Sequence, residues 1–160
     1  MSENIRRATP QDTADITAMI HALAEFERAP DQCTVTETQI SAALFGNSPT
    51  VRAHVAEVDG EVAAMALWFL SFSTWDGVAG IYVEDLFVRP KFRRRGLARG
   101  LLSVLAAECV DNGYTRLSWA VLNWNSDAIA LYDGIGGQPQ SEWTTYRLSG
   151  SRLSELAGPR

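Results

Sequence analysis

The order of apolar and polar residues divides the chain into short strands and longer helices. Its clearest part begins with a run of apolar, β-branched and aromatic residues at 80–88, which predicts a buried strand. Pro90 ends that strand, because proline has no N–H to give to a neighbouring strand. Apolar residues then recur at helical spacing, at Leu97, Leu101, Val104 and Leu105, so a long helix follows the strand.

Turn and cap signals place the elements on either side. Thr9-Pro10 begins a first helix that is expected to run to about Arg28, and the capping box Thr36-x-x-Gln39 begins a second one that runs through Phe45. Asp59-Gly60 predicts a tight hairpin turn. Strands are expected at residues 4–8, 51–58, 61–72, 80–88, 116–122 and 143–148, with a loop at 71–80.

The C-terminal part alternates again between helix and strand. Asn112-Gly113 ends the long helix, and a further helix begins at Asn125 or Ser126 and ends at Gly136-Gly137. The tail from Ser151 is expected to form a turn of helix. This order of elements implies an α+β domain in a three-layer α/β arrangement, with a mixed central sheet flanked by helices on both faces.

Composition and charge narrow the functional classes. The chain has 160 residues, 46% of them hydrophobic, which suits one globular domain over residues 1–160. Its net charge of −5 disfavours a nucleic-acid binder and suits cationic small molecules. Two cysteines are too few for a zinc cluster or a disulfide framework, so no metal is expected. We see no leader or membrane span and expect a cytoplasmic protein with no membrane partner.

The loop between the buried strand and the long helix has the features of an anion site. It carries a run of arginines, then Gly96, Ala98 and Gly100 at the start of the helix. The first helical turn leaves N–H groups unbonded, and small residues let a diphosphate approach the backbone. The glycine spacing fits neither a Walker loop nor the dinucleotide fingerprint. A basic surface loop that only precedes a helix is the alternative.

The spacing Arg93-x-x-Gly96-x-Ala98 resembles the Arg/Gln-x-x-Gly-x-Gly/Ala signature of the GNAT N-acetyltransferase superfamily, whose loop holds the pyrophosphate of acetyl-CoA. The predicted order of elements also matches that family. Four segments resemble its diamine acetyltransferase subgroup, which acetylates spermidine, spermine, related diamines or thialysine-type amino acids. These segments are residues 73–75, 82–86, 120–125 and 131–132.

The resemblance implies a site for acetyl-CoA as cosubstrate. Backbone groups of the central strand would bind the pantetheine arm and polarise the thioester carbonyl. Asn125 resembles the family asparagine that hydrogen-bonds the same arm, although it could also cap a helix. The expected cofactor-binding residues are Leu86, Phe87, Val88, Arg93, Arg94, Arg95, Gly96, Leu97, Ala98, Arg99, Gly100, Asn125 and Tyr132. One or two arginine side chains are expected to reach the phosphates, with the others solvated.

Acetyl transfer to an amine also needs a base and an acid. An alkylammonium has a pKa of about 10.4 and no lone pair at neutral pH, so its proton must first be removed. Glu84 is expensive to bury unpaired among apolar neighbours and is expected to line a cavity, where the resemblance makes it the base, acting through a water. Tyr132 stays protonated at neutral pH and could donate to the leaving thiolate. An ion pair for Glu84 and a core position for Tyr132 are the alternatives.

The substrate site is expected where the subgroup places its acids and aromatic rings. Those residues are Phe26, Glu27, Trp75, Glu84, Asp85, Glu142 and Trp143. Carboxylates would pair with ammonium groups, and aromatic rings would cover the methylenes. Compared with the subgroup, the loop between Trp75 and Glu84 is one residue longer, the turn before Trp143 is one residue shorter, and Phe26 stands where a tyrosine is common. These differences favour a short diamine or a thialysine-like amino acid over a long polyamine. The subgroup also implies a homodimer.

Three other functions stay open from the sequence. A non-catalytic acyl-CoA-binding module would share the loop, but it would need neither Tyr132 nor Glu84. An RNA-binding domain could use the arginines, but these have no adjacent aromatic platform and the net charge is unfavourable. A protein or antibiotic acetyltransferase would share the whole catalytic plan.

Overall fold

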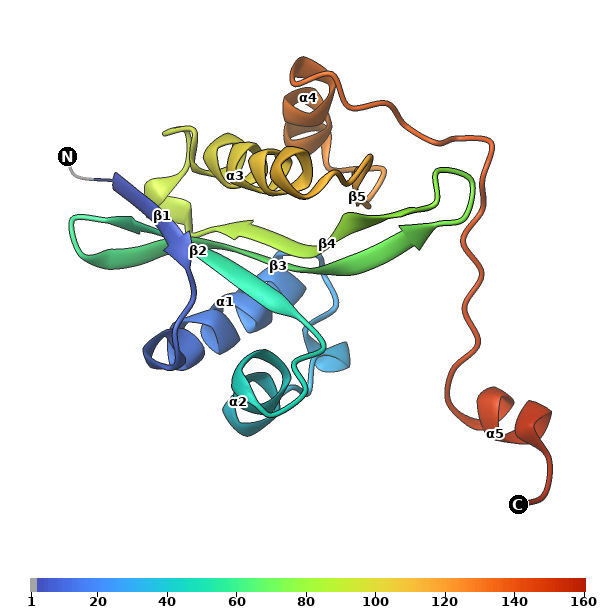
Figure 1. Cartoon of the computed structure of the whole chain (residues 1–160). Coiled ribbons are helices and arrows are strands. Elements are labelled where there is room, and N and C mark those ends of the chain that lie inside the picture. Colours follow the sequence, from blue (N-terminus) through green and yellow to red (C-terminus); the bar gives the residue numbers. More distant parts are fainter. Residues whose placement is uncertain (1–2) are drawn as a thin grey trace. The chain divides into compact units, whose positions relative to one another are not determined.

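The computed structural model describes residues 3–160, and their contacts form two compact units. The first unit ends at Ser126, and the second runs from Asp127 to Arg160. The first unit holds a five-stranded sheet in the order β1-β2-β3-β4-β5 (Figure 1). The strands are β1 (Glu3–Arg7), β2 (Arg52–Val58), β3 (Glu61–Ser73), β4 (Val78–Val88) and β5 (Leu117–Trp119). Neighbours from β1 to β4 are antiparallel and β5 is parallel to β4, so the predicted mixed sheet is confirmed.

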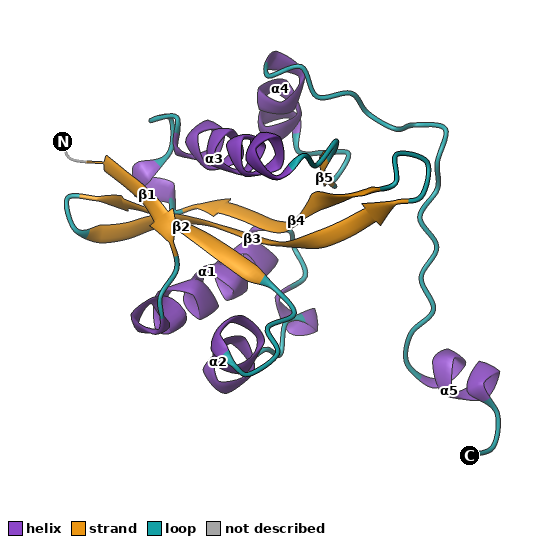
Figure 2. Ribbon diagram, in the orientation of Figure 1, coloured by secondary structure: helices purple, strands orange, loops and turns teal. Residues whose placement is uncertain are grey.

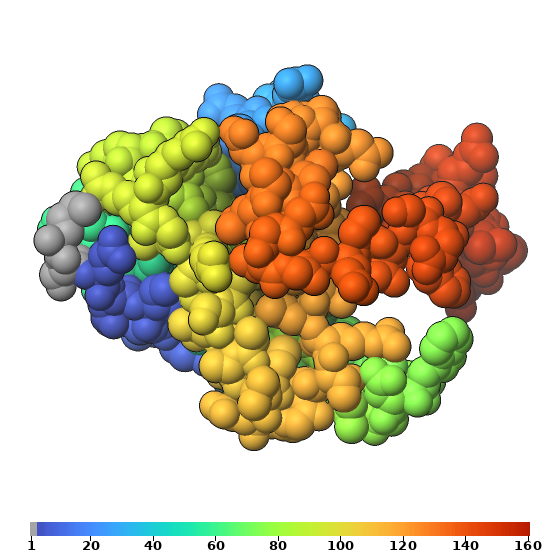
Figure 3. Space-filling view, turned by 90° about the horizontal axis from the view of Figure 1, so that it is seen from above, coloured from blue at the N-terminus to red at the C-terminus, as the bar shows by residue number. Residues whose placement is uncertain are grey.

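Helices cover both faces of this sheet, as Figure 2 shows. The helices of the first unit are α1 (Thr13–Phe26), α2 (Glu37–Phe45) and α3 (Leu97–Asn112). On one face, Ile16 of α1 and Ile40 of α2 pack with Met65, Leu67 and Phe87 of the sheet. On the other face lies α3, whose Leu101, Leu102 and Leu105 are buried. Figure 3 views the α3 side, where the loop before α3 lies at the surface.

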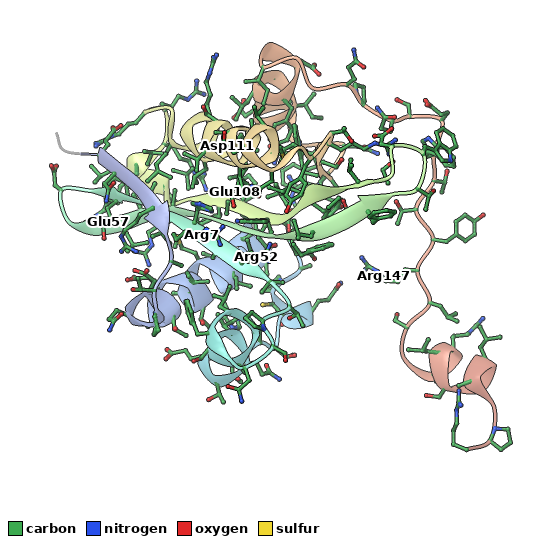
Figure 4. All side chains as sticks on the ribbon, in the orientation of Figure 1. Arg7, Arg52, Glu57, Glu108, Asp111 and Arg147 are labelled. Atoms are coloured by element: carbon green, nitrogen blue, oxygen red, sulfur yellow. The ribbon has the colours of Figure 1, made fainter. Side chains whose placement is uncertain are left out.

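A cluster of polar and charged side chains connects the sheet to α3. Buried Trp68 donates its indole N–H to Nδ1 of His54 over 3.1 Å. Arg7 of β1 pairs with Glu108 of α3 over 2.7 Å, and the guanidinium groups of Arg7 and Arg52 lie 5.1 and 5.3 Å from the Trp68 ring (Figure 4). Burial, followed by the charge of Arg7, lowers the pKa of His54, so the imidazole stays neutral and accepts the indole proton.

Several predicted boundaries move in the structure. The loop expected at 71–80 is only a four-residue turn, because Ser73 of β3 still pairs with Val78 of β4. The first helix opens as a 3₁₀ turn, η1 (Pro10–Asp12), before α1 begins. The strand expected at 116–122 is reduced to the three residues of β5. Gly113 has a φ of 71° and ends α3 in the left-handed conformation, as predicted.

The second unit contains helices and no strand among residues 127–160. Its elements are α4 (Ser126–Gly134), which begins at the unit boundary, and α5 (Ser151–Ala157), which confirms the expected helical turn from Ser151. The strand expected at 143–148 is wrong, since these residues have no regular structure. Trp143 and Tyr146 favour a strand only where another strand supplies hydrogen bonds, and this unit offers none.

Candidate active site

The loop before α3 ends in an open helix N-terminus. The first hydrogen bond inside the helix runs from the N–H of Gly100 to the carbonyl of Gly96 over 2.9 Å. The N–H groups of Leu97, Ala98 and Arg99 therefore have no acceptor within α3. Gly96 has a φ of 80°, and a Cβ added there would meet no atom within 4 Å, so the loop is open beside it. This arrangement suits an anion at the start of α3.

Gly100 has a packing role, while its part in binding the cofactor stays a prediction. A Cβ added at Gly100 would lie 2.8 Å from Cδ1 of Ile5 in β1, so this glycine lets α3 approach the sheet. The arginines of this loop also differ from one another in their contacts. Arg93 turns back, donates to the carbonyl of Val88 over 3.0 Å and lies 5.1 Å from the ring of Phe26. Arg94 and Arg99 are exposed beside the start of α3, where phosphate contacts are possible.

The central strand β4 changes its pairing at Glu84. Val83 lies opposite Trp68 and Asp85 lies opposite Leu67, so Glu84 is the extra residue of a β-bulge. The bulge interrupts the alternation of side chains, and Glu84 is exposed rather than enclosed by its apolar neighbours. Bulges often re-aim a side chain beside an active site, which fits the predicted catalytic position.

The same strand has an open edge beyond the bulge. β5 pairs with β4 only along Ile81 to Val83, and the next residues toward Val88 have no strand on that side among residues 3–160. Leu86, Phe87 and Val88 keep their pairing with β3 on the other side. Backbone groups along the open edge are thus placed to bind an extended ligand, as the resemblance predicted for these three residues.

Three carboxyl groups gather where α1 ends near β4. Burial raises the pKa of Asp85 to about 6, and the charges of Glu84 and Glu27 add to that rise. Burial also raises the pKa of Glu27, the residue that follows α1. None of the three forms an ion pair with a protein cation in residues 3–160. A bound ammonium group would relieve this repulsion, so the cluster is suited to an amine.

Aromatic rings and guanidinium groups border the carboxyl cluster. The rings of Phe26 and Trp124 lie 5.7 Å apart at an angle of 52°. The guanidinium of Arg28 lies 4.2 Å from the ring of Trp124. Phe26 was among the predicted site residues, whereas Trp124 and Arg28 were not. Trp124 stands inside the segment 120–125 that carried the resemblance, which is the signal that could have identified it.

The remaining predicted residues lie on other elements of the chain. Trp75 is 86% exposed at the tip of the β3–β4 turn. Trp75 lies beyond Val78, the first residue of β4. Val78 itself is six residues, or about 20 Å, from Glu84 along the strand. Asn125 immediately precedes α4, and its N–H donates to the carbonyl of Leu122 over 2.9 Å. Tyr132 on α4, and Glu142 and Trp143 in the segment after it, belong to the second unit, so their roles stay predictions.

No group of three His, Cys, Asp or Glu side chains within residues 3–160 could hold a metal ion. Of the helices in the same residues, none combines the length and apolar character needed to span a bilayer.

Comparisons with known proteins give one consistent result. A family model described as Acetyltransferase (GNAT) family matches residues 16–136. The chain is 39% identical to a thialysine N-epsilon-acetyltransferase of Caenorhabditis elegans, with 93% of each chain covered. It is 36% identical to the Bos taurus protein of that name, with 96% of each covered. It is 27% identical to an L-ornithine N5-acetyltransferase of Arabidopsis thaliana, with 98% of this chain and 88% of that one covered.

Solved structures agree on the fold. An integron cassette protein from the mobile metagenome of V. cholerae superposes with a TM-score of 0.83 at 24% identity, over 99% of each chain. An aminoglycoside N-acetyltransferase in complex with CoA gives a TM-score of 0.73 at 16% identity, over 92% of this chain and 95% of that one. At these identities the likeness supports the three-layer arrangement alone.

Proposed function

Because this chain belongs to the GNAT acetyltransferase family and is an N-acetyltransferase, we propose that it transfers the acetyl group of acetyl-CoA to the terminal amine of a thialysine-like amino acid or a short diamine. The observation that carries the substrate proposal is the cluster of Glu27, Glu84 and Asp85, three acids that pair with no cation in the described part of the chain, residues 3–160. The names of the relatives support it, since thialysine and ornithine are both amino acids with a terminal amine.

We place acetyl-CoA along α3 and β4. Its pyrophosphate would accept hydrogen bonds from the N–H groups of Leu97, Ala98 and Arg99, aided by the partial positive charge of the helix start. Its pantetheine arm would follow the open edge of β4 from the bulge to Val88. Asn125 is proposed to bind the same arm. The phosphate contacts fall to Arg94, Arg95 and Arg99, because Arg93 turns toward Val88 and Phe26.

Each chemical step has a proposed residue. Glu84 accepts the ammonium proton through a water, which frees the nitrogen lone pair for attack on the thioester carbonyl. A backbone N–H of β4 stabilises the negative oxygen of the tetrahedral intermediate. The C–S bond then breaks, and Tyr132 gives its phenolic proton to the leaving thiolate. The attacking nitrogen gives its second proton, through water, back to the Tyr132 phenolate, so the products are the acetylated amine and CoA thiol.

We also propose that residues 1–160 act as one acetyltransferase domain. The family match at 16–136 crosses the boundary between the two compact units, which supports this proposal. By analogy with the subgroup, we expect a homodimer in the cytoplasm. Size-exclusion chromatography with light scattering measures the oligomeric state directly.

A kinetic screen tests the proposed function. Release of CoA thiol from acetyl-CoA would be followed with thialysine, ornithine, lysine, short diamines, spermidine, spermine and aminoglycosides as acceptors. We expect the highest kcat/KM with amino acids or short diamines that carry a terminal amine. Turnover confined to aminoglycosides or to protein substrates would contradict the proposal.

The variant Tyr132→Phe tests the chemistry within the same assay. Removal of a positioned acid should lower kcat about 100-fold, because the thiolate then leaves without a proton donor. Calorimetry should show acetyl-CoA affinity within threefold of the wild type, since only the hydroxyl is removed. Normal turnover across the pH range would assign the proton to another group.

A further inference from the structure

Arg28 holds a backbone conformation that arginine rarely adopts. Its φ is 64°, in the left-handed region where glycine is the usual residue. The N–H of Arg28 donates to the carbonyl of Glu25 over 3.0 Å, and the N–H of Ala29 donates to that of Ala24 over 2.9 Å. These two bonds form a Schellman motif that ends α1, with Arg28 at the position that glycine normally occupies. Because the conformation is unfavourable for arginine, we infer that its side chain has a role of its own.

The side chain is held over Trp124 and has no carboxylate partner. Its guanidinium lies 4.2 Å from the centre of the Trp124 ring. No Asp or Glu oxygen within residues 3–160 lies within 4 Å of it, although Glu27 is its neighbour in the chain. The flat face of the guanidinium is therefore occupied, while its five N–H donors are available to an anion in the bidentate geometry that carboxylates favour.

We propose that Arg28 binds the α-carboxylate of an amino acid substrate and so determines substrate specificity. Glu27 and Arg28 then form an adjacent anion and cation, which match the α-ammonium and α-carboxylate of one amino acid. The terminal amine of the same substrate lies at Glu84 and Asp85. The inference rests on the proposed function and extends it, because it selects amino acids over diamines.

The same arginine acts against a diamine. A diamine presents a second ammonium group where the amino acid presents its α-carbon, and that ammonium meets the like charge of Arg28. Specificity thus combines an attraction for the right substrate with a repulsion of the wrong one. The ring of Trp124 holds the guanidinium of Arg28, and the ring of Phe26 lies 5.7 Å from that of Trp124, beside the carboxyl cluster.

The test uses pairs of acceptors that differ only in the α-carboxylate. Such pairs are L-ornithine with putrescine, L-lysine with cadaverine, and L-thialysine with its decarboxylated diamine. The variant Arg28→Gly removes the guanidinium and suits the backbone conformation, so the fold is expected to survive. We expect kcat/KM for each amino acid to fall at least tenfold, while kcat/KM for its diamine stays the same or rises. The ratio of the two is the readout.

Arg94→Gly is the matched control. Arg94 also has a φ of 64°, so this variant makes the same change of residue, charge and backbone freedom in the basic loop. It can weaken acetyl-CoA binding, but it should lower the rates with both members of a pair by the same factor. An unchanged ratio in Arg94→Gly beside a changed ratio in Arg28→Gly assigns the effect to the position of the charge.

A binding experiment separates this inference from the proposed function. Calorimetric titration of L-thialysine into the enzyme with CoA should give a Kd at least tenfold weaker for Arg28→Gly than for the wild type. If the wild type acetylates none of these amines yet shows this difference, the proposed function fails and the carboxylate site stands. Equal losses for amino acid and diamine, no change for either, or no binding of thialysine to the wild type would each overturn the inference.

Discussion

The two ends of α1 differ in how their charged side chains are paired. At its start, Arg6 donates to both oxygens of Asp12, over 2.7 and 3.0 Å, and to Glu57 over 2.6 Å. The hydrogen bond from Arg6, which is the largest effect, holds the pKa of Asp12 below its usual range although the side chain is buried. Every ionised group in this network has an opposite charge within hydrogen-bonding distance.

At its end, α1 brings together groups of like charge. Glu27, Glu84 and Asp85 form no ion pair with a cation among residues 3–160, and burial raises the pKa of Asp85 to about 6. Arg28 is close in sequence, yet its guanidinium lies on Trp124 and has no carboxylate within 4 Å among residues 3–160. Charges at one end of the helix stabilise the fold, whereas those at the other end are arranged for a ligand.

The variant Asp12→Asn should show the largest effect on stability. It removes the anion from a pair whose carboxylate is only 4% exposed, so the free energy of unfolding at pH 7 should fall by about 3 kcal/mol. Arg6 is partly exposed, which sets the expectation at the low end of the range for buried pairs. Urea denaturation followed by circular dichroism gives the value.

The pH dependence of that loss has a defined sign. The folded pKa of Asp12 lies below the ordinary value of 3.8, so its contribution is fully present above pH 4 and is lost as the pH falls through the folded value. The wild type and Asp12→Asn should therefore converge once the pH falls below the folded pKa of Asp12. A constant gap at all pH values would mean that packing, and not charge, produces the effect.

An aspartate-to-asparagine substitution at the other end of α1, at Asp85, should raise the free energy of unfolding instead of lowering it. At pH 7 the carboxylate of Asp85 is ionised at a cost, since its folded pKa of about 6 exceeds the unfolded value of 3.8. A difference of about two pKa values sets an upper limit near 3 kcal/mol, and partial exposure reduces the expectation to about 1–2 kcal/mol. Asp85→Asn should thus be more stable than the wild type at pH 7, while its kcat/KM with amines falls.

The gain in stability of Asp85→Asn over the wild type should also vary with pH. A raised folded pKa gives the wild type its full stability below pH 4, and that stability is lost as the pH rises through 6. The advantage of Asp85→Asn should therefore disappear at pH 4. If Asp85→Asn destabilises the protein at pH 7, the carboxylate has a partner in the folded state and the proposed contrast between the two ends is wrong.

Much of the fold could be predicted because local signals agree with the tertiary structure. The capping box at Thr36 is present, since Gln39 N–H donates to the Thr36 hydroxyl over 3.2 Å. The glycine at 113 ends α3 as expected. The strand at 143–148 failed for the opposite reason, because a strand needs a partner that the sequence of the segment does not contain.

Residues of the candidate site could be predicted where they lie in motifs of the family. The acids at 27, 84 and 85 and the loop before α3 follow from the resemblance, although their catalytic roles are still to be tested. Arg28 was missed because a left-handed arginine leaves no mark in the sequence: glycine is the signal for that conformation, and the Schellman bonds appear only in three dimensions. The β-bulge at Glu84 was missed because apolar runs do not reveal register.

The smallest predicted effect concerns what holds Arg28 in place. Arg28→Ala loses the contact with Trp124 but keeps a Cβ in the left-handed conformation, so it should be less stable than the wild type by about 0.5–1 kcal/mol. Arg28→Gly loses the same contact and relieves the strain, so it should exceed Arg28→Ala by about 1 kcal/mol and lie close to the wild type. In a Trp124→Leu background, Arg28→Ala should have almost no effect, since the ring that held the guanidinium is gone. Equal stability of wild type and Arg28→Ala would show that the cation–π contact contributes nothing, and that the arginine is positioned by its backbone alone.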